Sequence, residues 1–201
     1  LSGRGIRLIN QSDLGISAAE EPFATFEGNA LAKARHASHA CGHPAIADDS
    51  GFCVDALKGG PGVRSARYFS DAKQQDDPAE RTEVNAINGL QLTTDAANLR
   101  WLLHQAYRAI GIADAPRPAR PISDARFVAA MAMVRFAEDP EPIVVRGTWQ
   151  GQLYSEPLGD GGFGYDPLFF DPNLGLTAAQ MSLDQKRAVS HRGKALDALL
   201  A

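Results

Sequence analysis

The sequence predicts an α/β or α+β fold built on a mixed sheet, and three observations favour this fold class. Helical and strand patterns are interspersed along the 201 residues without the strict alternation of a parallel βαβ protein. Turns rich in glycine and proline separate these patterns. The hydrophobic content of 44% and the charged content of 22% are those of an ordinary globular protein. The length suits one domain, so residues 1–201 are expected to form a single domain.

The first part of the chain offers a short strand, a helix and a pair of strands. The short strand is expected over 5–9. Thr25 can cap a helix over 26–41, whose apolar residues fall on one face and which Gly42 and Pro44 would end. Two short strands, 45–48 and 52–55, flank an acidic turn, and a glycine-rich loop over 59–62 follows them.

The second part of the chain predicts helices first and a hairpin later. Residues 78–110 carry two helical patterns, and the proline-rich stretch 115–121 is predicted to be a connector. The longest strand candidates, 127–136 and 142–153, are separated by a polar turn and should form a hairpin. A glycine-rich loop over 159–166 precedes a short apolar run, 168–170. Ser190 can cap a final helix.

Charge and cysteine usage narrow the class of protein. The net charge of −4 and the pI of about 5.7 argue against a nucleic-acid partner. They still permit a polyanionic small ligand, because a bound metal can offset its charge. Cys41 and Cys53 are too few for a disulfide framework and are expected to be small buried side chains in a reducing compartment. No apolar run has the length of a membrane span and no signal peptide is visible, so a cytoplasmic location is expected.

Two acidic motifs offer hard oxygen ligands. Asp48 and Asp49 are adjacent at a strand end, and because side chains alternate along a strand, one carboxylate should point to each side. A functional interpretation is a magnesium ligand together with a base that activates water; a solvated turn explains the pair equally well. Glu20 and Glu21 precede a helix and could simply favour its N-terminus. Together with the aspartates, they can supply a second acidic metal ligand.

The glycine-rich segment 161–167 suggests a site for a flat ligand. Glycines around an aromatic residue let a ligand approach the backbone. Phe163 or Tyr165 can stack on a base, and Asp166 can accept a hydrogen bond from a ring N–H. The alternative is a glycine-rich turn with both aromatic rings buried in the core.

Basic residues near the C-terminus suggest an anion or carbonyl site. Lys186 precedes the sequence Ser190-His191-Arg192-Gly193-Lys194, which places cations and a capping serine at a helix N-terminus. Ordinary capping with surface charges is the alternative. The remaining histidines show no spacing typical of a metal site (His36, His39, His43 and His104).

Taken together, these motifs resemble the inosine/xanthosine triphosphate pyrophosphatase family. The matching stretches are ADDSG (47–51), DALKGGPGVRSARY (55–68), GGFGYDP (161–167), SHRGKAL (190–196) and, more weakly, TFEGNALAKARHA (25–37). The resemblance implies an elongated α/β fold with two lobes and a central substrate cleft. It implies a magnesium-dependent homodimer that hydrolyses ITP, dITP and XTP to the monophosphate and pyrophosphate and so removes them from the nucleotide pool.

The resemblance also implies roles for particular residues. Asp49 would be the general base and a metal ligand, with Glu21 or its neighbour Glu20 as the other acidic ligand. Two further residues, Lys33 and Asp48, would lie in the same polar site. The substrate would be contacted by Ser50, and its base held by Phe163, Gly164, Tyr165 and Asp166 with Lys186, His191 and Arg192.

Two departures from the family pattern and three alternatives accompany this interpretation. The family opens with a strand and a Thr/Ser-x-Asn-x-x-Lys loop that binds the triphosphate, and this N-terminal strand and phosphate loop are expected to be missing from the sequence as it stands. Residues 81–98 resemble an insertion without a functional interpretation. The alternatives are a pyrophosphatase with a different base preference, a catalytically impaired nucleotide-binding protein, and, most weakly, a nucleic-acid-binding module.

Overall fold

The computed structural model describes residues 7–113, 115–116 and 118–201, and a five-stranded sheet forms its spine. The strands lie side by side in chain order and every neighbouring pair is antiparallel. The α/β prediction is confirmed, but the predicted mixed sheet is wrong: each strand pairs with its neighbour in sequence, and no parallel crossover connects the described strands. The strands are β1 (Ala45–Val54), β2 (Pro121–Val134), β3 (Ile143–Tyr154), β4 (Phe169–Asp171) and β5 (Leu176–Thr177).

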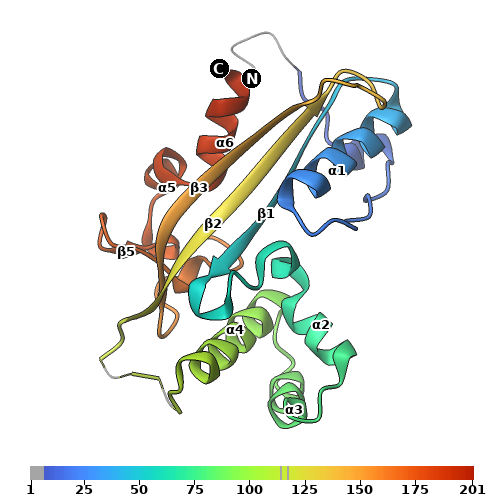
Figure 1. The fold of residues 1–201 in the computed structure, drawn as a ribbon. Coiled ribbons are helices and arrows are strands. Elements are labelled where there is room, and N and C mark those ends of the chain that lie inside the picture. Colours follow the sequence, from blue (N-terminus) through green and yellow to red (C-terminus); the bar gives the residue numbers. More distant parts are fainter. Residues whose placement is uncertain (1–6, 114, 117) are drawn as a thin grey trace.

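Helices cover both faces of the long strands (Figure 1). On one face, α1 (Phe26–Cys41) packs against β1 and β2; on the other, α6 (His191–Leu200) packs against β3 and β2, next to α5 (Leu183–Val189). The helix predicted over 26–41 is confirmed together with its cap, because Thr25 Oγ1 accepts a hydrogen bond of 3.2 Å from the Gly28 N–H. Gly42 ends α1 in the left-handed conformation at φ 68°.

A second group of helices gathers at one end of the sheet (Figure 1). It consists of α2 (Tyr68–Gln75), α3 (Arg81–Gly89) and α4 (Thr94–Ile110), with a small core of its own around Phe69, Ile87 and Trp101. The two helices predicted within 78–110 are confirmed as α3 and α4, whereas α2 was not predicted. None of the described helices is long and apolar enough to cross a membrane.

The acidic stretch of β1 lies inside a continuous strand. The sequence predicts two short strands around a turn, but β1 pairs with β2 along all ten residues, including Asp48 with Met131 and Gly51 with Val128. The antiparallel partner satisfies the backbone hydrogen bonds of the polar residues, so no turn is needed there. The strand expected over 5–9 is not found at residues 7–9, and residues 5–6 lie outside the described residues.

A cluster of buried aromatic rings from β2, β3 and β4 forms part of the hydrophobic core. Phe127 and Trp149 pack against Phe169 with ring centroids 4.8 and 4.5 Å apart. Short 3-10 helices connect the larger elements around this core: η2 (Gln11–Leu14), η3 (Asp55–Leu57), η4 (Gly62–Arg67), η5 (Asp166–Leu168) and η6 (Ala178–Gln180). Because a well-packed aromatic core is rigid, the loops that rest on it are held in place.

Candidate active site

Strand β1 sends Asp48 and Asp49 to opposite faces of the sheet, as the alternation of a strand predicts. Asp49 faces α1 with a side chain only 7% exposed. Its Oδ1 accepts a hydrogen bond of 2.9 Å from Lys33 Nζ, and its Oδ2 accepts one of 3.1 Å from Asn29 Nδ2. Asn29 and Lys33 are four residues apart on α1 and therefore lie on one helical face. This face of α1 fixes the Asp49 carboxylate and compensates its charge.

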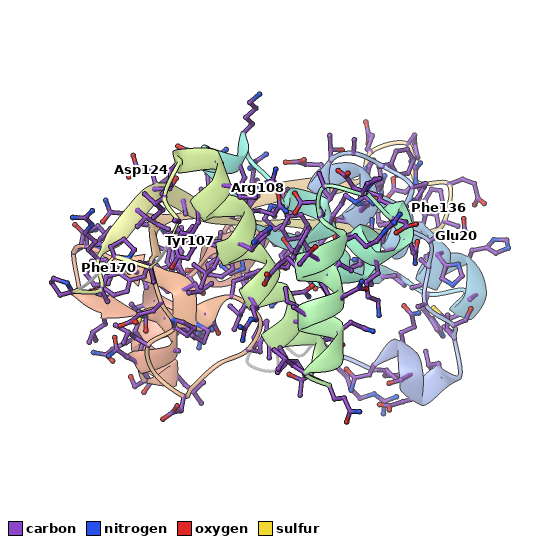
Figure 2. All side chains as sticks on the ribbon, turned by 90° about the horizontal axis from the view of Figure 1, so that it is seen from below. Glu20, Tyr107, Arg108, Asp124, Phe136 and Phe170 are labelled. Carbon is purple, nitrogen blue, oxygen red and sulfur yellow. The ribbon has the colours of Figure 1, made fainter. Side chains whose placement is uncertain are left out.

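The segment before α1 brings Glu21 to the same ammonium group. Glu21 Oε1 lies 2.6 Å from Lys33 Nζ, and Glu21 Oε2 lies 2.9 Å from Arg67 Nη1. Lys33 also donates to the Asp48 carbonyl oxygen over 3.2 Å. Glu20 is exposed and lies at the same end of the view as α1 and Phe136 (Figure 2). The structure therefore distinguishes the two glutamates, which the sequence could not.

The ion pairs around Lys33 favour the charged forms of both Glu21 and Lys33. Burial raises the pKa of Glu21, but the hydrogen bonds and charges of Lys33 and Arg67 outweigh it and hold the pKa below its ordinary value. Burial lowers the pKa of Lys33, but its bonds to Glu21 and Asp49 outweigh that effect and raise it. Lys33, in the middle of α1, thus lies between the carboxylates of Glu21 and Asp49.

The donor set suits a hard cation but does not complete a metal shell. Glu21 and Asp49 offer carboxylate oxygens, which magnesium prefers, and the ammonium of Lys33 already lies between them. Within the described residues no group of three or more His, Cys, Asp or Glu could hold a metal ion. Magnesium usually takes one or two carboxylates and completes its shell with waters and phosphate oxygens. Glu21 and Asp49 fit such a partial ligand set.

On the opposite face, Asp48 meets the first turn of α6. Its Oδ2 accepts a hydrogen bond of 3.0 Å from Arg192 Nε, and its side chain is 39% exposed. Ser190 caps α6 by accepting from the Gly193 N–H over 3.1 Å. The helix approaches β3 closely because Gly147 has no side chain; a Cβ there would lie 2.0 Å from the His191 carbonyl oxygen. Ser50 follows on the same face of β1 as Asp48 and is half-buried.

The loop after β3 presents an exposed aromatic ring to two cations. Phe163 is 62% exposed. Lys186 Nζ lies 5.0 Å, and Arg192 Cζ 5.5 Å, from the centroid of its ring. These distances are typical of cation–π contacts. The glycine-rich segment and the basic residues near the C-terminus, two separate motifs in the sequence, are brought together here.

Asp166 lies beneath this loop and holds it. Its Oδ2 accepts a hydrogen bond of 2.8 Å from the Phe163 N–H and pairs with Lys186 Nζ, and its side chain is only 3% exposed. Gly162 passes so close that a Cβ would lie 2.0 Å from Asp166 Oδ2, which requires glycine. The prediction that Asp166 accepts from a ring N–H of the base is not supported by this geometry, because the carboxylate faces its own loop. It positions Phe163 and Lys186.

Two predicted contact residues belong largely to the core. Tyr165 is buried and stacks on Phe52 at 5.3 Å, and its hydroxyl donates to the Ser65 carbonyl oxygen over 2.9 Å. Stacking of a base on Tyr165 is therefore wrong, because both the ring and the hydroxyl are already engaged. His191 is buried against Phe127 with ring centroids 4.8 Å apart. Among the described residues its Nδ1 finds no hydrogen-bond partner, and a direct contact of His191 with the substrate stays a prediction.

The environment of His191 keeps its ring neutral. Burial, followed by the charges of Arg192, Lys186 and Lys194, lowers its pKa to about 3. A charged imidazole would add a fourth cation to this part of α5 and α6. The positive charge beside Phe163 therefore comes from the lysine and the arginine, not from the histidine.

Two contacts in the site were missed by sequence reasoning. Asn29 could have been found, because it precedes Lys33 by one helical turn in a stretch already singled out. Arg67 reaches Glu21 across 46 residues of chain, and no local pattern signals such a contact.

The fold and the site together define an α/β protein with a carboxylate pair held by Lys33 on the α1 side of β1 and an aromatic ring beside two cations on the α6 side. The chain belongs to the Ham1 family, whose family model matches residues 3–201. The family expected from the motifs is thereby confirmed.

Individual relatives agree over nearly the whole chain. A protein named dITP/XTP pyrophosphatase from Nitrosomonas europaea is 43% identical over 200 residues, covering 100% of this chain and 83% of the relative. One of the same name from Burkholderia pseudomallei is 45% identical over 202 residues, with the same coverage. The solved structure of a HAM1 protein from Coxiella burnetii matches with a TM-score of 0.74 at 35% identity, covering 94% of this chain and 81% of the other. The Staphylococcus aureus Ham1 protein matches with a TM-score of 0.69 at 33% identity, with the same coverage.

Proposed function

We propose that this chain is a dITP/XTP pyrophosphatase, a single-domain enzyme that hydrolyses ITP, dITP and XTP to the nucleoside monophosphate and pyrophosphate. Its role would be to remove these non-canonical purine nucleotides from the nucleotide pool. Relatives of that name at 43% and 45% identity support the proposal.

One observation carries the assignment to these residues: a continuous series of contacts joins the carboxylates to the aromatic loop. Lys33 bridges Glu21 and Asp49 and also reaches the backbone of Asp48. Asp48 then pairs with Arg192, which lies over Phe163. Hydrolysis of a nucleoside triphosphate uses both the carboxylates and the aromatic loop. The phosphates require a cation and a proton acceptor for the attacking water, and the purine ring requires a flat surface with hydrogen-bond donors.

The proposed chemistry places Asp49 at the reacting phosphate. The oxygen of a water molecule attacks the α-phosphorus, the bond to the bridging oxygen of the β-phosphate breaks, and pyrophosphate leaves. Asp49 takes the proton of the attacking water, and Asn29 and Lys33 orient its carboxylate for that transfer. General-base assistance of this kind is worth about 10²–10⁴-fold in rate.

Glu21 and Asp49 would hold magnesium in this proposal, with phosphate oxygens and waters completing its shell. When bound, the metal supplies neutralisation of the negative charge on the phosphate oxygens. Lys33 adds a second positive charge beside the same carboxylates. Arg67 holds the other oxygen of Glu21 and so sets the direction in which that carboxylate points.

Base selection would come from Lys186 and Arg192. Both side chains are hydrogen-bond donors without acceptor capacity. Hypoxanthine and xanthine carry a carbonyl at the six position, which can accept from them, whereas adenine carries an amino group there. A base laid against the exposed ring of Phe163 would bring that position toward the two cations. Adenine would then leave desolvated donors unmatched.

Three wider features of the proposal concern shape and assembly. The sheet with α1, α5 and α6 would form one lobe and α2–α4 the other, with the substrate cleft between them. The enzyme would act as a homodimer in the cytoplasm. Sedimentation at several protein concentrations tests the dimer directly, and a monomer at all of them would contradict it.

The experiment that tests the function measures pyrophosphate release from ITP, XTP, dITP, GTP and ATP, each with magnesium and with excess EDTA. We expect turnover of the first three, a kcat/KM for ATP lower by about 10²-fold or more, and no turnover in EDTA. Equal rates on ATP would indicate a different base preference. Nucleotide binding without pyrophosphate release would indicate a binding protein that has lost catalysis.

A further inference from the structure

The segment 81–98, which has no role in the function proposed so far, reaches the aromatic loop through one carboxylate. Asp95 lies in the first turn of α4, and its Oδ2 accepts a hydrogen bond of 2.8 Å from the Gly164 N–H. Gly164 directly follows Phe163 and has a left-handed backbone at φ 57°. We propose that Asp95 is a positioning residue for substrate selection, which sets the place of Phe163 against Lys186 and Arg192. This inference rests on the proposed function.

Two carboxylates from different elements bind consecutive amides of the loop. The Phe163 N–H donates to Asp166, three residues further along the same loop, and the Gly164 N–H donates to Asp95, 69 residues away in sequence. Asp166 alone would fix the loop only against itself and Lys186. Asp95 ties the peptide after Phe163 to a separate helix, so the ring is held from both sides of its own residue.

The first turn of α4 is a firm anchor for this contact. One turn after Asp95, the buried Asn98 accepts from the Phe69 N–H over 2.9 Å and donates to the Ala66 carbonyl oxygen over 3.1 Å. Thr93 caps the helix by accepting from the Ala96 N–H over 3.3 Å. Because these contacts fix the start of α4, the carboxylate of Asp95 presents its oxygen at a defined place.

The same anchor connects the loop to the carboxylate site. Ala66 belongs to η4, in which Ser65 accepts the hydroxyl hydrogen bond of Tyr165, the residue after Gly164. The last residue of η4, Arg67, pairs with Glu21. The start of α4 thus contacts the loop and braces the short helix that contacts Glu21. A displaced loop would change the fit of the base without removing the groups that carry out hydrolysis.

An acidic residue at a helix N-terminus has a simpler explanation, which the experiment must exclude. Asp95 could merely favour the dipole of α4, and its loss would then lower stability and leave substrate selection unchanged. Glu83 provides the matched control, because it is an acidic residue in the first turn of the neighbouring α3. Asp95→Asn is the conservative variant, since the amide oxygen can still accept from the Gly164 N–H.

The test compares Asp95→Ala, Asp95→Asn and Glu83→Ala with the parent in steady-state kinetics on ITP and ATP. For Asp95→Ala we expect the KM for ITP to rise about tenfold, with kcat within about twofold and the preference for ITP over ATP reduced. Asp95→Asn should keep a KM close to that of the parent, and Glu83→Ala should leave it unchanged. A KM for ITP that is unchanged in Asp95→Ala, or raised equally in Glu83→Ala, overturns the proposal.

Hydrogen exchange of the Gly164 amide gives a readout that does not depend on activity. Exchange should be slow in the parent and in Asp95→Asn and faster in Asp95→Ala; equal rates in all three overturn the proposal. If the parent releases no pyrophosphate from any triphosphate, the proposed function fails, and calorimetry with ITP then decides the positioning role. Weaker ITP binding by Asp95→Ala supports it, and equal binding overturns it.

Discussion

Asp48 and Asp49 are identical neighbours on one strand, yet they lie in two different environments. Asp49 faces α1 with a side chain 7% exposed and two hydrogen-bond donors; Asp48 faces α6 with a side chain 39% exposed and one arginine partner. The α1 face is a closed, charge-compensated site that can hold the Asp49 carboxylate in place as a general base. The α6 face is more open and leads to the ring of Phe163, over which the guanidinium of Arg192 lies. One peptide bond therefore separates the proposed chemistry from the proposed recognition.

The largest expected difference between the two faces is in turnover. Asp49→Asn should lower kcat by about 10²–10⁴-fold, because an amide cannot take the proton of the attacking water. Asp48→Asn should lower kcat by about tenfold or less, since it weakens only the contact with Arg192. The fold of both variants should persist, because each substitution keeps the size of the side chain. Pyrophosphate release and thermal melting measure both effects, and turnover of Asp49→Asn within tenfold of the parent would refute the assignment.

The two faces should also lose stability in different pH ranges. The pKa of His191 on the α6 face is about 3 in the folded protein, below its ordinary value of 6.5. As the pH falls below 6.5, the unfolded chain therefore binds a proton that the folded chain does not. The contribution of the neutral ring to the free energy of unfolding is fully present above pH 6.5 and is lost as the pH falls toward 3. At pH 5 this loss is about 2 kcal/mol. The depressed pKa of Glu21 on the α1 face acts only at lower pH, below its ordinary value of 4.5.

Urea unfolding at pH 7 and pH 5 tests this difference. His191→Phe keeps an aromatic ring against Phe127 and removes the titrating group, so it should abolish most of the loss between these two pH values. Glu21→Gln should leave that loss unchanged. If the free energy of unfolding fell equally in the parent and in His191→Phe, the titration of His191 would not be the cause of the loss between pH 7 and pH 5.

Of the two faces of β1, the α6 face rather than the α1 face should set the substrate preference. Arg192→Ala should narrow the ratio of kcat/KM for ITP to that for ATP by about tenfold, because one donor for the six-position carbonyl is lost. Lys194→Ala, which removes a cation two residues further along α6, should leave the ratio unchanged. A ratio that is unaltered in Arg192→Ala would place the base pocket elsewhere in the chain.

The smallest expected effect is on the magnesium requirement, which the α1 face should determine. Glu21→Gln should raise the magnesium concentration needed for half-maximal activity several-fold, because one proposed ligand loses its charge. Glu20→Gln should not change that concentration, since Glu20 is exposed and Glu21 holds Lys33 and Arg67. Titration of activity with magnesium measures both variants. The reverse result would exchange the roles of the two glutamates.

Local signals predicted the elements whose ends are encoded locally. Thr25 and Gly42 mark the ends of α1, and the polar turn between β2 and β3 marks their hairpin. The continuity of β1 was missed, because Asp48 and Asp49 are unusual strand residues that become acceptable only beside β2. The antiparallel order of the sheet was missed as well, since strand pairing is a long-range property that hydrophobic patterns do not specify.

Motif order predicted which segments form the candidate site, while the orientation of individual side chains remained open. Lys33, Asp49, Phe163, Lys186 and Arg192 are brought into one series of contacts, as expected. Tyr165 and Asp166 were assigned to the base, and both face inward instead. A glycine-rich loop can turn either of two neighbouring aromatic rings toward the core, and only the fit against Phe52 and Ser65 selects Tyr165.

By itself, the sequence predicted the family, the helices α1, α3, α4 and α6, the hairpin and most of the charged residues of the candidate site, because caps, turns and motif spacing are encoded over short distances. The tertiary structure alone decided which glutamate joins Lys33, which aspartate faces α1, and which aromatic ring stays exposed. It also decided that Asp95, from a segment with no recognisable motif, supports the loop through Gly164. Each of these choices depends on contacts between segments distant in the chain, whose geometry is set only when the helices pack on the two faces of the sheet.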